Sequence, residues 1–174
     1  MADAEWLRGR IRDIPDFPSP GIVFRDITPL LGDIEALRFT VDALAAAFAG
    51  RRIDKVVGVE ARGFILAAPV AYRLGAGFVP VRKPGKLPWR TESEEYALEY
   101  GVDRLEMHQD ALTQGEQVLI VDDVIATGGT AQATARLVER GGGTVAGLAF
   151  ALELTYLSGR EKLDGYDIVS LVTY

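Results

Sequence analysis

The chain of 174 residues is predicted to form an α/β fold, with a doubly wound, mostly parallel sheet flanked by helices. The first observation behind this prediction is that short apolar runs alternate with amphipathic segments along most of the sequence. The second is the run from Val118 to Val121, which is apolar throughout, as is typical of a parallel strand buried on both faces. The third is that two acids follow this run directly, at the strand end where open α/β sheets bind their ligands.

Each element of this fold follows from a local pattern. The longest helix should begin after Asp33, a suitable N-cap, because apolar residues recur at spacings of four, three and four from Leu37 to Phe48. Gly75 should end the next helix, and the proline-rich segment from Ile14 to Gly21 is incompatible with a helix interior. We predict helices over residues 4–11, 34–49, 63–74 and 130–140, and strands over residues 55–60, 77–82, 118–122, 144–152 and 167–172.

Residues 84–103 interrupt this regular alternation. They are rich in Pro, Gly, Glu and Tyr and lack a sustained period, so we interpret them as a loop or flexible hairpin. Long irregular stretches inside a compact domain are usually functional lids or disordered segments. Because no internal repeat or linker is visible, we expect a single domain over residues 1–174.

The composition argues against several classes of protein. The 19 Lys and Arg residues against 25 Asp and Glu residues give a net charge of −6, which disfavours nucleic-acid binding and favours a small-molecule partner. No run approaches the roughly 20 apolar residues that span a membrane, and the N-terminus lacks the apolar core of a secretory signal. The chain has no cysteine and a single histidine, so we expect neither disulfides nor a thiolate or histidine-rich metal site, and a cytoplasmic location is compatible with this.

The most informative segment runs from Val118 to Thr130 and reads VLIVDDVIATGGT. Asp122 and Asp123 offer two carboxylates that can accept hydrogen bonds from hydroxyl groups. The small residues after them open a helix, and the N–H groups at a helix N-terminus form a site for a phosphate. The segment therefore favours a ribose 5-phosphate as ligand, although one of the acids could instead cap the following turn.

Two other strand ends carry cations at the same expected edge of the sheet. Arg62 and Gly63 follow one strand, and Arg82, Lys83 and Lys86 follow the next. The planar fork of an arginine, and a local cluster of cations in an acidic chain, are both suited to a pyrophosphate. From the local sequence alone, both groups are also consistent with solvated surface charges.

The segment with the two acids resembles the phosphoribosyl pyrophosphate-binding motif of the type I phosphoribosyltransferases. The resemblance implies the fold of that family, with Asp122 and Asp123 on the 2′ and 3′ hydroxyls of the ribose. It also implies that the 5′-phosphate is held by Ala126, Thr127, Gly128, Gly129 and Thr130. The turn that would hold the pyrophosphate in such a protein consists here of Glu60, Ala61, Arg62 and Gly63.

The N-terminal segment PGIVFRDITP, from Pro20 to Pro29, is similar to the adenine-specific members of this family. The similarity implies that residues 1–33 form a hood over the base. Phe24 would stack on the purine, since bases stack on aromatic rings, whereas a lone phenylalanine near a turn is usually part of a core. The resemblance assigns the base contacts to the backbone of Val23 and Arg25, to Phe24, and to Ile125 on the other face of the base.

Two further runs, RKPGKLP from Arg82 and YALEYG from Tyr96, are similar to the flexible catalytic loop of the same adenine-specific members. They imply that residues 84–103 form this loop. Glu99 would be the general acid/base, although by its spacing alone it could be an exposed acid on a short strand. The resemblance assigns pyrophosphate contacts to Arg82, Lys83, Lys86 and Tyr100.

The resemblance implies an enzyme of purine salvage that converts adenine and 5-phosphoribosyl pyrophosphate into AMP and pyrophosphate. It implies Mg²⁺ as cofactor, held mainly by substrate oxygens with few protein ligands, and a homodimer without a nucleic-acid or membrane partner. Two alternatives stay open. One is a transferase for xanthine, hypoxanthine or orotate, and the other is a regulator that binds phosphoribosyl pyrophosphate without turnover.

Overall fold

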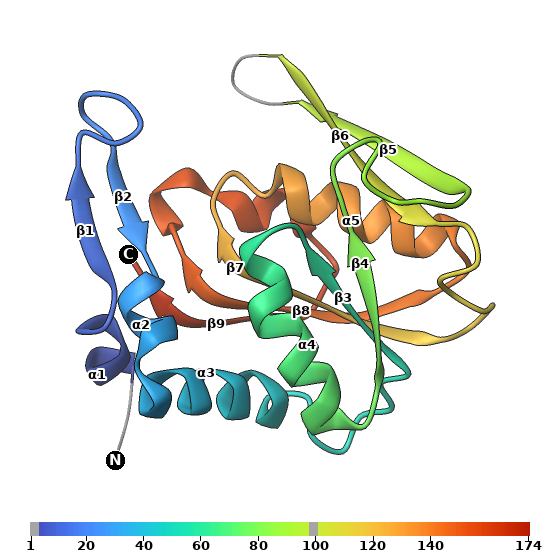
Figure 1. The fold of residues 1–174 in the computed structure, drawn as a ribbon, viewed down its shortest axis with the longest axis horizontal. Coiled ribbons are helices and arrows are strands. Elements are labelled where there is room, and N and C mark those ends of the chain that lie inside the picture. The colour runs from blue at the N-terminus through green and yellow to red at the C-terminus, as the bar shows by residue number, and fades with distance from the viewer. Residues whose placement is uncertain (1–3, 98–100) are drawn as a thin grey trace.

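The structure, a computed structural model, describes residues 4–97 and 101–174. Its central sheet consists of β3 (Lys55–Val59), β4 (Gly77–Val81), β7 (Gln117–Ile125), β8 (Thr144–Glu153) and β9 (Ile168–Thr173). The strands follow the order β4-β3-β7-β8-β9, and every neighbouring pair is parallel (Figure 1). The predicted α/β fold with a parallel, doubly wound sheet is therefore confirmed.

Helices cover both faces of this sheet, with α3 (Ile34–Ala46) and α4 (Arg62–Leu74) on one face and α5 (Gly129–Arg140) on the other. Successive side chains of a strand point to opposite faces. Accordingly, Val56 belongs to the core under α3 and α4, whereas its neighbour Val57 belongs to the core under α5. This is why the central strands are apolar throughout instead of alternating.

The N-terminal segment forms a layer at one end of the sheet (Figure 1). It consists of α1 (Ala4–Arg8), β1 (Arg12–Pro15), β2 (Val23–Asp26) and α2 (Thr28–Gly32), and β1 and β2 form an antiparallel pair. Leu7, Ile27 and Leu30 pack with Leu152 and Val172 of the sheet in a third core. This contact holds the β1–β2 hairpin beside the carboxyl ends of β8 and β9.

Two antiparallel strands, β5 (Thr91–Ala97) and β6 (Val102–His108), form an arm that lies across α5 (Figure 1). Residues 84–103, which we interpreted as a loop or flexible hairpin, include β5 and the start of β6, and the second strand continues to His108. The structural reason is visible in β6, where Leu105 and Met107 alternate with polar residues and are completely buried. The arm therefore contributes to the core under α5.

Other predicted boundaries differ by a few residues. The first helix ends at Arg8 instead of residue 11, and α3 ends at Ala46. Strand β7 extends to Ile125, so that Asp122 and Asp123 lie within the strand, because β8 continues to pair with it there. Asp33 caps α3 as predicted. Two short 3₁₀ helices, η1 (Thr155–Leu157) and η2 (Gly159–Leu163), follow β8.

Among the residues that the structure describes, we find no helix with the length and apolar character that crossing a membrane requires.

Candidate active site

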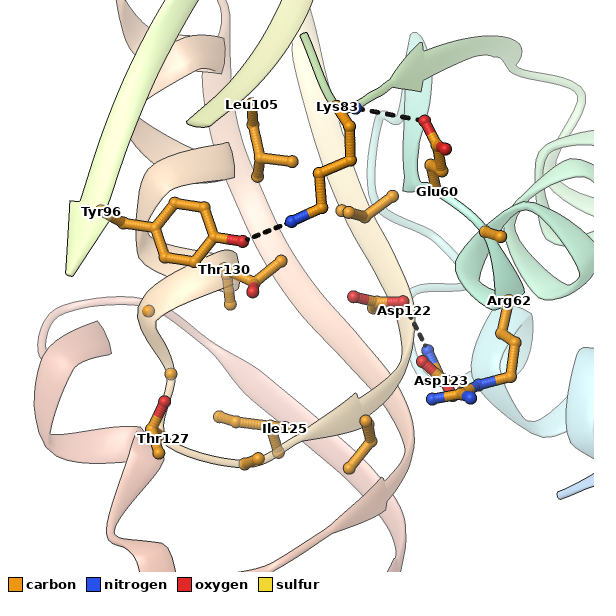
Figure 2. A pocket seen from close by; sticks show the side chains of 17 residues that line it. Glu60, Arg62, Lys83, Tyr96, Leu105, Asp122, Asp123, Ile125, Thr127 and Thr130 are labelled. Carbon is orange, nitrogen blue, oxygen red and sulfur yellow. Dashed lines mark hydrogen bonds and ion pairs between the residues drawn. The ribbon is translucent and has the colours of Figure 1, made fainter. Parts of the chain in front are cut away.

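A pocket of about 340 Å³ opens at the carboxyl ends of β3 and β7 (Figure 2). The β3–α4 turn, the β7–α5 loop and the arm each contribute to its walls. The loops from neighbouring parallel strands meet here because their carboxyl ends share one edge of the sheet. The residues of the sequence-based site that line this pocket are Glu60, Ala61, Arg62, Lys83, Asp122, Asp123, Ile125, Ala126, Thr127, Gly128, Gly129 and Thr130.

Asp122 and Asp123 form the acidic wall of this pocket. Oδ1 of Asp122 accepts a hydrogen bond from the backbone N–H of Asp123 at 2.9 Å, while the carboxylate of Asp123 pairs with Nε of Arg62. Burial, together with the neighbouring negative charge of Asp123, raises the pKa of Asp122 well above its usual range. Gly63 packs directly against this carboxyl, since a Cβ there would lie 2.5 Å from Oδ1 of Asp122.

The β7–α5 loop forms the other wall, at the N-terminus of α5. Gly128 has φ +78, which favours glycine, and a Cβ at this position would collide with the carbonyl oxygen of Gly159. The loop therefore brings its backbone close to η2 and turns sharply into the helix. Backbone N–H groups at the first turn of α5, with the hydroxyl groups of Thr127 and Thr130, can surround a phosphate.

An ion pair between η2 and β8 supports the β7–α5 loop. Arg160 of η2 donates from Nε and Nη2 to the two carboxylate oxygens of Glu153, each at 2.7 Å. The hydrogen bonds from Arg160 lower the pKa of Glu153, despite the opposing effect of burial. Because Gly159 precedes Arg160 and abuts Gly128, this bidentate pair positions the β7–α5 loop.

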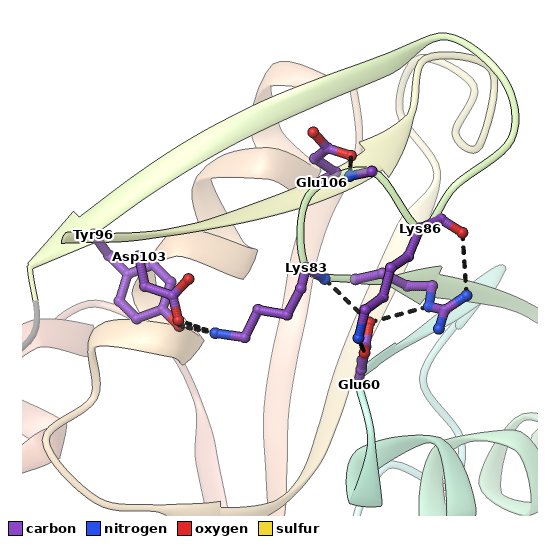
Figure 3. Close-up of polar contacts among 8 residues, drawn as sticks. Glu60, Lys83, Lys86, Tyr96, Asp103 and Glu106 are labelled. Atoms are coloured by element: carbon purple, nitrogen blue, oxygen red, sulfur yellow. Dashed lines mark hydrogen bonds and ion pairs between the residues drawn. The ribbon is translucent and has the colours of Figure 1, made fainter.

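A network around Glu60 joins the cations at the start of the arm. Its carboxylate accepts hydrogen bonds from Nε of Arg82 at 3.0 Å and from the backbone N–H of Lys83 at 3.1 Å, and it also pairs with the ammonium of Lys86 (Figure 3). Burial opposes ionisation of Glu60, but these bonds outweigh it, so the pKa of Glu60 is below its usual range. The peptide bond between Glu60 and Ala61 is cis.

A second cavity, of about 660 Å³, lies beside the first under the β1–β2 hairpin. Val23, Phe24 and Arg25 of the N-terminal segment line it. The two cavities share Arg62, Val124, Ala126 and Thr127 as lining residues. Ile125 is almost completely buried and lines the first cavity, whereas its neighbour Val124 lines both.

Gly21 and Ile22 of the N-terminal segment also line the second cavity. Its remaining wall comes from residues that sequence analysis missed, namely Leu154, Tyr156 and Leu157. They follow the carboxyl end of β8, and Tyr156 is 61% exposed. The sequence did contain a signal for them, namely a tyrosine and two leucines directly after a buried strand. The end of that strand lies at the same edge of the sheet as the other loops of the site. Tyr96 and Leu105 also line the first cavity but were given no role, although Tyr96 begins the YALEYG run.

Arg62 lies between the two cavities and contacts both walls. Its guanidinium pairs with Asp123 and lies 5.4 Å from the ring centroid of Phe24. The ring of Phe24 also packs edge-on against Phe17, with 5.3 Å between centroids. The predicted Glu99 and Tyr100 lie outside the described residues, in the segment that joins β5 to β6.

Known proteins share this chain's sequence and structure along nearly its whole length. Residues 31–172 match the phosphoribosyl transferase domain family. Adenine phosphoribosyltransferase of Thermotoga neapolitana is 60% identical over 168 residues, covering 97% of this chain and 99% of that protein. The crystal structure of adenine phosphoribosyltransferase from Thermoanaerobacter pseudethanolicus matches with a TM-score of 0.96 and 57% identity, covering 98% of this chain and 99% of the other.

The Saccharomyces cerevisiae adenine phosphoribosyltransferase, complexed with adenine and an iminoaltritol bisphosphate, gives a TM-score of 0.91 at 41% identity and covers 97% of each chain. A parallel sheet with a carboxylate pair and a glycine-containing loop at its edge, together with the matched domain, defines the type I phosphoribosyltransferase class. Within this class the similar proteins share one activity, and the chain belongs to the adenine phosphoribosyltransferase family.

Proposed function

We propose that the protein transfers the 5-phosphoribosyl group of phosphoribosyl pyrophosphate to adenine, which yields AMP and pyrophosphate in purine salvage. The observation that carries this proposal is the pair of adjoining cavities that share Arg62 and Val124. One cavity offers carboxylates and a helix N-terminus to a sugar phosphate, and the other offers an aromatic ring to a base. The sugar carbon that changes partners would lie where the cavities meet. The yeast relative complexed with adenine supports this choice of base.

Asp122 and Asp123 are proposed to accept hydrogen bonds from the ribose hydroxyls. Because burial disfavours the charged form of Asp122, hydroxyl donors would stabilise that form and lower its pKa again. Binding of the sugar and ionisation of the carboxyl would therefore favour each other. The 5′-phosphate would lie on the loop from Ala126 to Thr130, and contacts at both ends of the sugar would fix its orientation.

The leaving pyrophosphate is proposed to lie beside Lys83 and the turn from Glu60 to Gly63, with Arg82, Lys86 and Tyr100 as further contacts. Cations at this position stabilise the negative charge that develops as the bond to the sugar breaks. Glu99 is proposed as the general acid/base for the purine nitrogen, a role worth roughly 10²–10⁴-fold in rate. The arm that flanks this segment would help to exclude water, which otherwise attacks the sugar cation.

Magnesium is the proposed cofactor. Asp122 and Asp123 present hard carboxylate oxygens, the ligand type that Mg²⁺ prefers. Within residues 4–97 and 101–174, no group of three or more acids or histidines forms a protein cage for a metal ion. We therefore propose that substrate oxygens provide most of the ligands. When bound, the ion would neutralise charge on the pyrophosphate.

A homodimer and a cytoplasmic location are also part of the proposal. Ile34, Ile65 and Tyr72 expose apolar surface on α3 and α4, and a second copy of the chain would cover it. Light scattering on the purified protein would give the mass in solution, and a mass near 18.9 kDa would contradict the dimer.

The decisive experiment is an assay of pyrophosphate release from phosphoribosyl pyrophosphate and Mg²⁺, with adenine, hypoxanthine, guanine or xanthine added separately. We expect release with adenine alone. Release with a different base would retain the sugar-phosphate site but contradict the assignment of the hood. An absence of release with every base would leave a binding role only.

A further inference from the structure

Three side chains connect the arm to the sugar-phosphate pocket. The ammonium of Lys83, which follows β4, donates to the hydroxyl of Tyr96 at 3.1 Å and pairs with the carboxylate of Asp103. The Tyr96 hydroxyl in turn donates to Oδ2 of Asp103 at 3.0 Å (Figure 3). Tyr96 and Asp103 are directly opposite each other on β5 and β6. A carboxylate of the arm is therefore held on a cation of the pocket.

The position of this cluster gives it access to a ligand. Lys83 and Tyr96 both line the pocket, on the side opposite the carboxylates of Asp122 and Asp123 (Figure 2). The side chain of Asp103 is 26% exposed and that of Lys83 is 38% exposed. Partial burial makes the attraction within this pair stronger than it is at an open surface. Any anion that binds to Lys83 meets the negative charge of Asp103 next to it.

Glu60, the other carboxylate near these cations, does not contact the ammonium of Lys83. Glu60 pairs with the charged groups of Arg82 and Lys86, but it receives only the backbone N–H of Lys83. Among the described residues, the carboxylate that the ammonium of Lys83 contacts is that of Asp103. A lysine ammonium has three N–H donors, of which Tyr96 and Asp103 occupy two.

We propose that Asp103 is a positioning residue that competes with pyrophosphate for Lys83 and so limits how tightly this product is held. The inference rests on the proposed function, because it takes Lys83 as a pyrophosphate contact. Pyrophosphate would either displace Asp103 from the ammonium or bind beside it against electrostatic repulsion. In both cases the affinity for pyrophosphate is lower than Lys83 alone would give. Tyr96 keeps Lys83 and Asp103 aligned during the exchange.

The test is the substitution Asp103→Asn, which removes the charge and keeps an oxygen that can accept the hydrogen bonds. We expect the dissociation constant of pyrophosphate, measured by calorimetry in the presence of Mg²⁺, to fall about two- to fivefold, the range of a partly exposed ion pair. The matched control is Glu95→Gln. Glu95 also pairs with a cation across the arm, but its partner Arg104 does not line the pocket. This control should leave the dissociation constant unchanged.

A double-mutant cycle separates the inference from its premise. Lys83→Gln should weaken pyrophosphate binding, and Asp103→Asn should have no effect in the Lys83→Gln background. If Lys83→Gln weakens binding but Asp103→Asn does not tighten it, the competition is overturned and the proposed function stands. If Lys83→Gln leaves the affinity unchanged, the pyrophosphate assignment of Lys83 fails and the inference fails with it. A persistent effect of Asp103→Asn in the double variant would also overturn the inference.

Discussion

At the scale of single residues, Gly63 packs directly against the carboxyl of Asp122. Gly63→Ala would place a methyl group against Oδ1 of Asp122 and displace that carboxyl. We expect the KM for phosphoribosyl pyrophosphate to rise on the order of ten- to a hundredfold, since a small misplacement of a binding group has effects of this size. Steady-state kinetics would measure it. Gly32→Ala is the control, because a Cβ there meets no neighbour within 4 Å, and an equal effect in both variants would contradict the explanation.

A second single residue, Asp26 of the N-terminal segment, makes the free energy of unfolding depend on pH in the acid range. It accepts hydrogen bonds from the hydroxyl and backbone N–H of Thr28 and from Arg12, and these bonds lower its pKa from 3.8 to about 2. Since the pKa is lower in the folded state, the stabilisation is complete above pH 3.8 and is lost as the pH falls toward 2. Asp26→Asn should therefore reduce the free energy of unfolding by about 1–2 kcal/mol at neutral pH.

Chemical denaturation of the wild type and of Asp26→Asn at several pH values would test this. The difference between their unfolding free energies should shrink from pH 4 to pH 2, because the wild type loses the interaction that the variant already lacks. Other acids titrate in the same range, so only the difference between the two proteins is informative. A difference that stays constant over this range would contradict the assignment of the pKa to Asp26.

At the scale of elements, ion pairs of one carboxylate add to the apolar packing that holds the arm on α5. Glu94 of β5 pairs with Arg136 at 3.3 Å and with Arg140 at 2.9 Å, and Arg140 also donates to the carbonyl of Ser93 at 2.5 Å. Glu94→Gln should lower the free energy of opening of the arm by about 1 kcal/mol. Faster amide hydrogen exchange in β5 and β6, with unchanged exchange in α4, would be the expected result. Glu95→Gln, within the arm, should not change exchange at the contact with α5.

The elements also show which parts of a fold local patterns can predict. Helices α3, α4 and α5 have a long apolar stripe, so their positions followed from periodicity, with errors at the ends only. The strands β1 and β2 have four residues each and are separated by prolines and glycine, so no period could develop. Strand β5 reads TESEEYA, and its apolar support comes from its partner strand and α5. Such pairing depends on distant residues.

At the scale of the whole molecule, the site also has one part that the local sequence predicts and another part that it does not. The run from Asp122 to Thr130 is continuous in sequence, so its residues could be assigned together, and the structure brings all of them to one pocket. Asp103 gave no comparable signal, and Tyr156 gave only its place after a buried strand. Asp103 reaches Lys83 only because β6 folds back over the pocket, and Tyr156 reaches the hood only because β8 ends beside it. Contacts of this kind arise from tertiary structure and are invisible to local spacing.

The connection between hood and sheet predicts coupling between the two halves of the molecule. Arg62 stacks on Phe24 of the hood and pairs with Asp123 of the sheet, so changes at either residue alter the same guanidinium. Phe24→Leu should raise the KM for adenine, by an amount equivalent to a loss of about 1–3 kcal/mol of binding free energy. Asp123→Asn should raise the KM for phosphoribosyl pyrophosphate. In the double variant the losses in kcat/KM should deviate from additivity by about 0.5–3 kcal/mol. Phe24→Leu combined with Lys83→Gln, which has no contact with Arg62, should be additive. Additive losses in both pairs would show that the base and sugar cavities act independently and that Arg62 does not connect them.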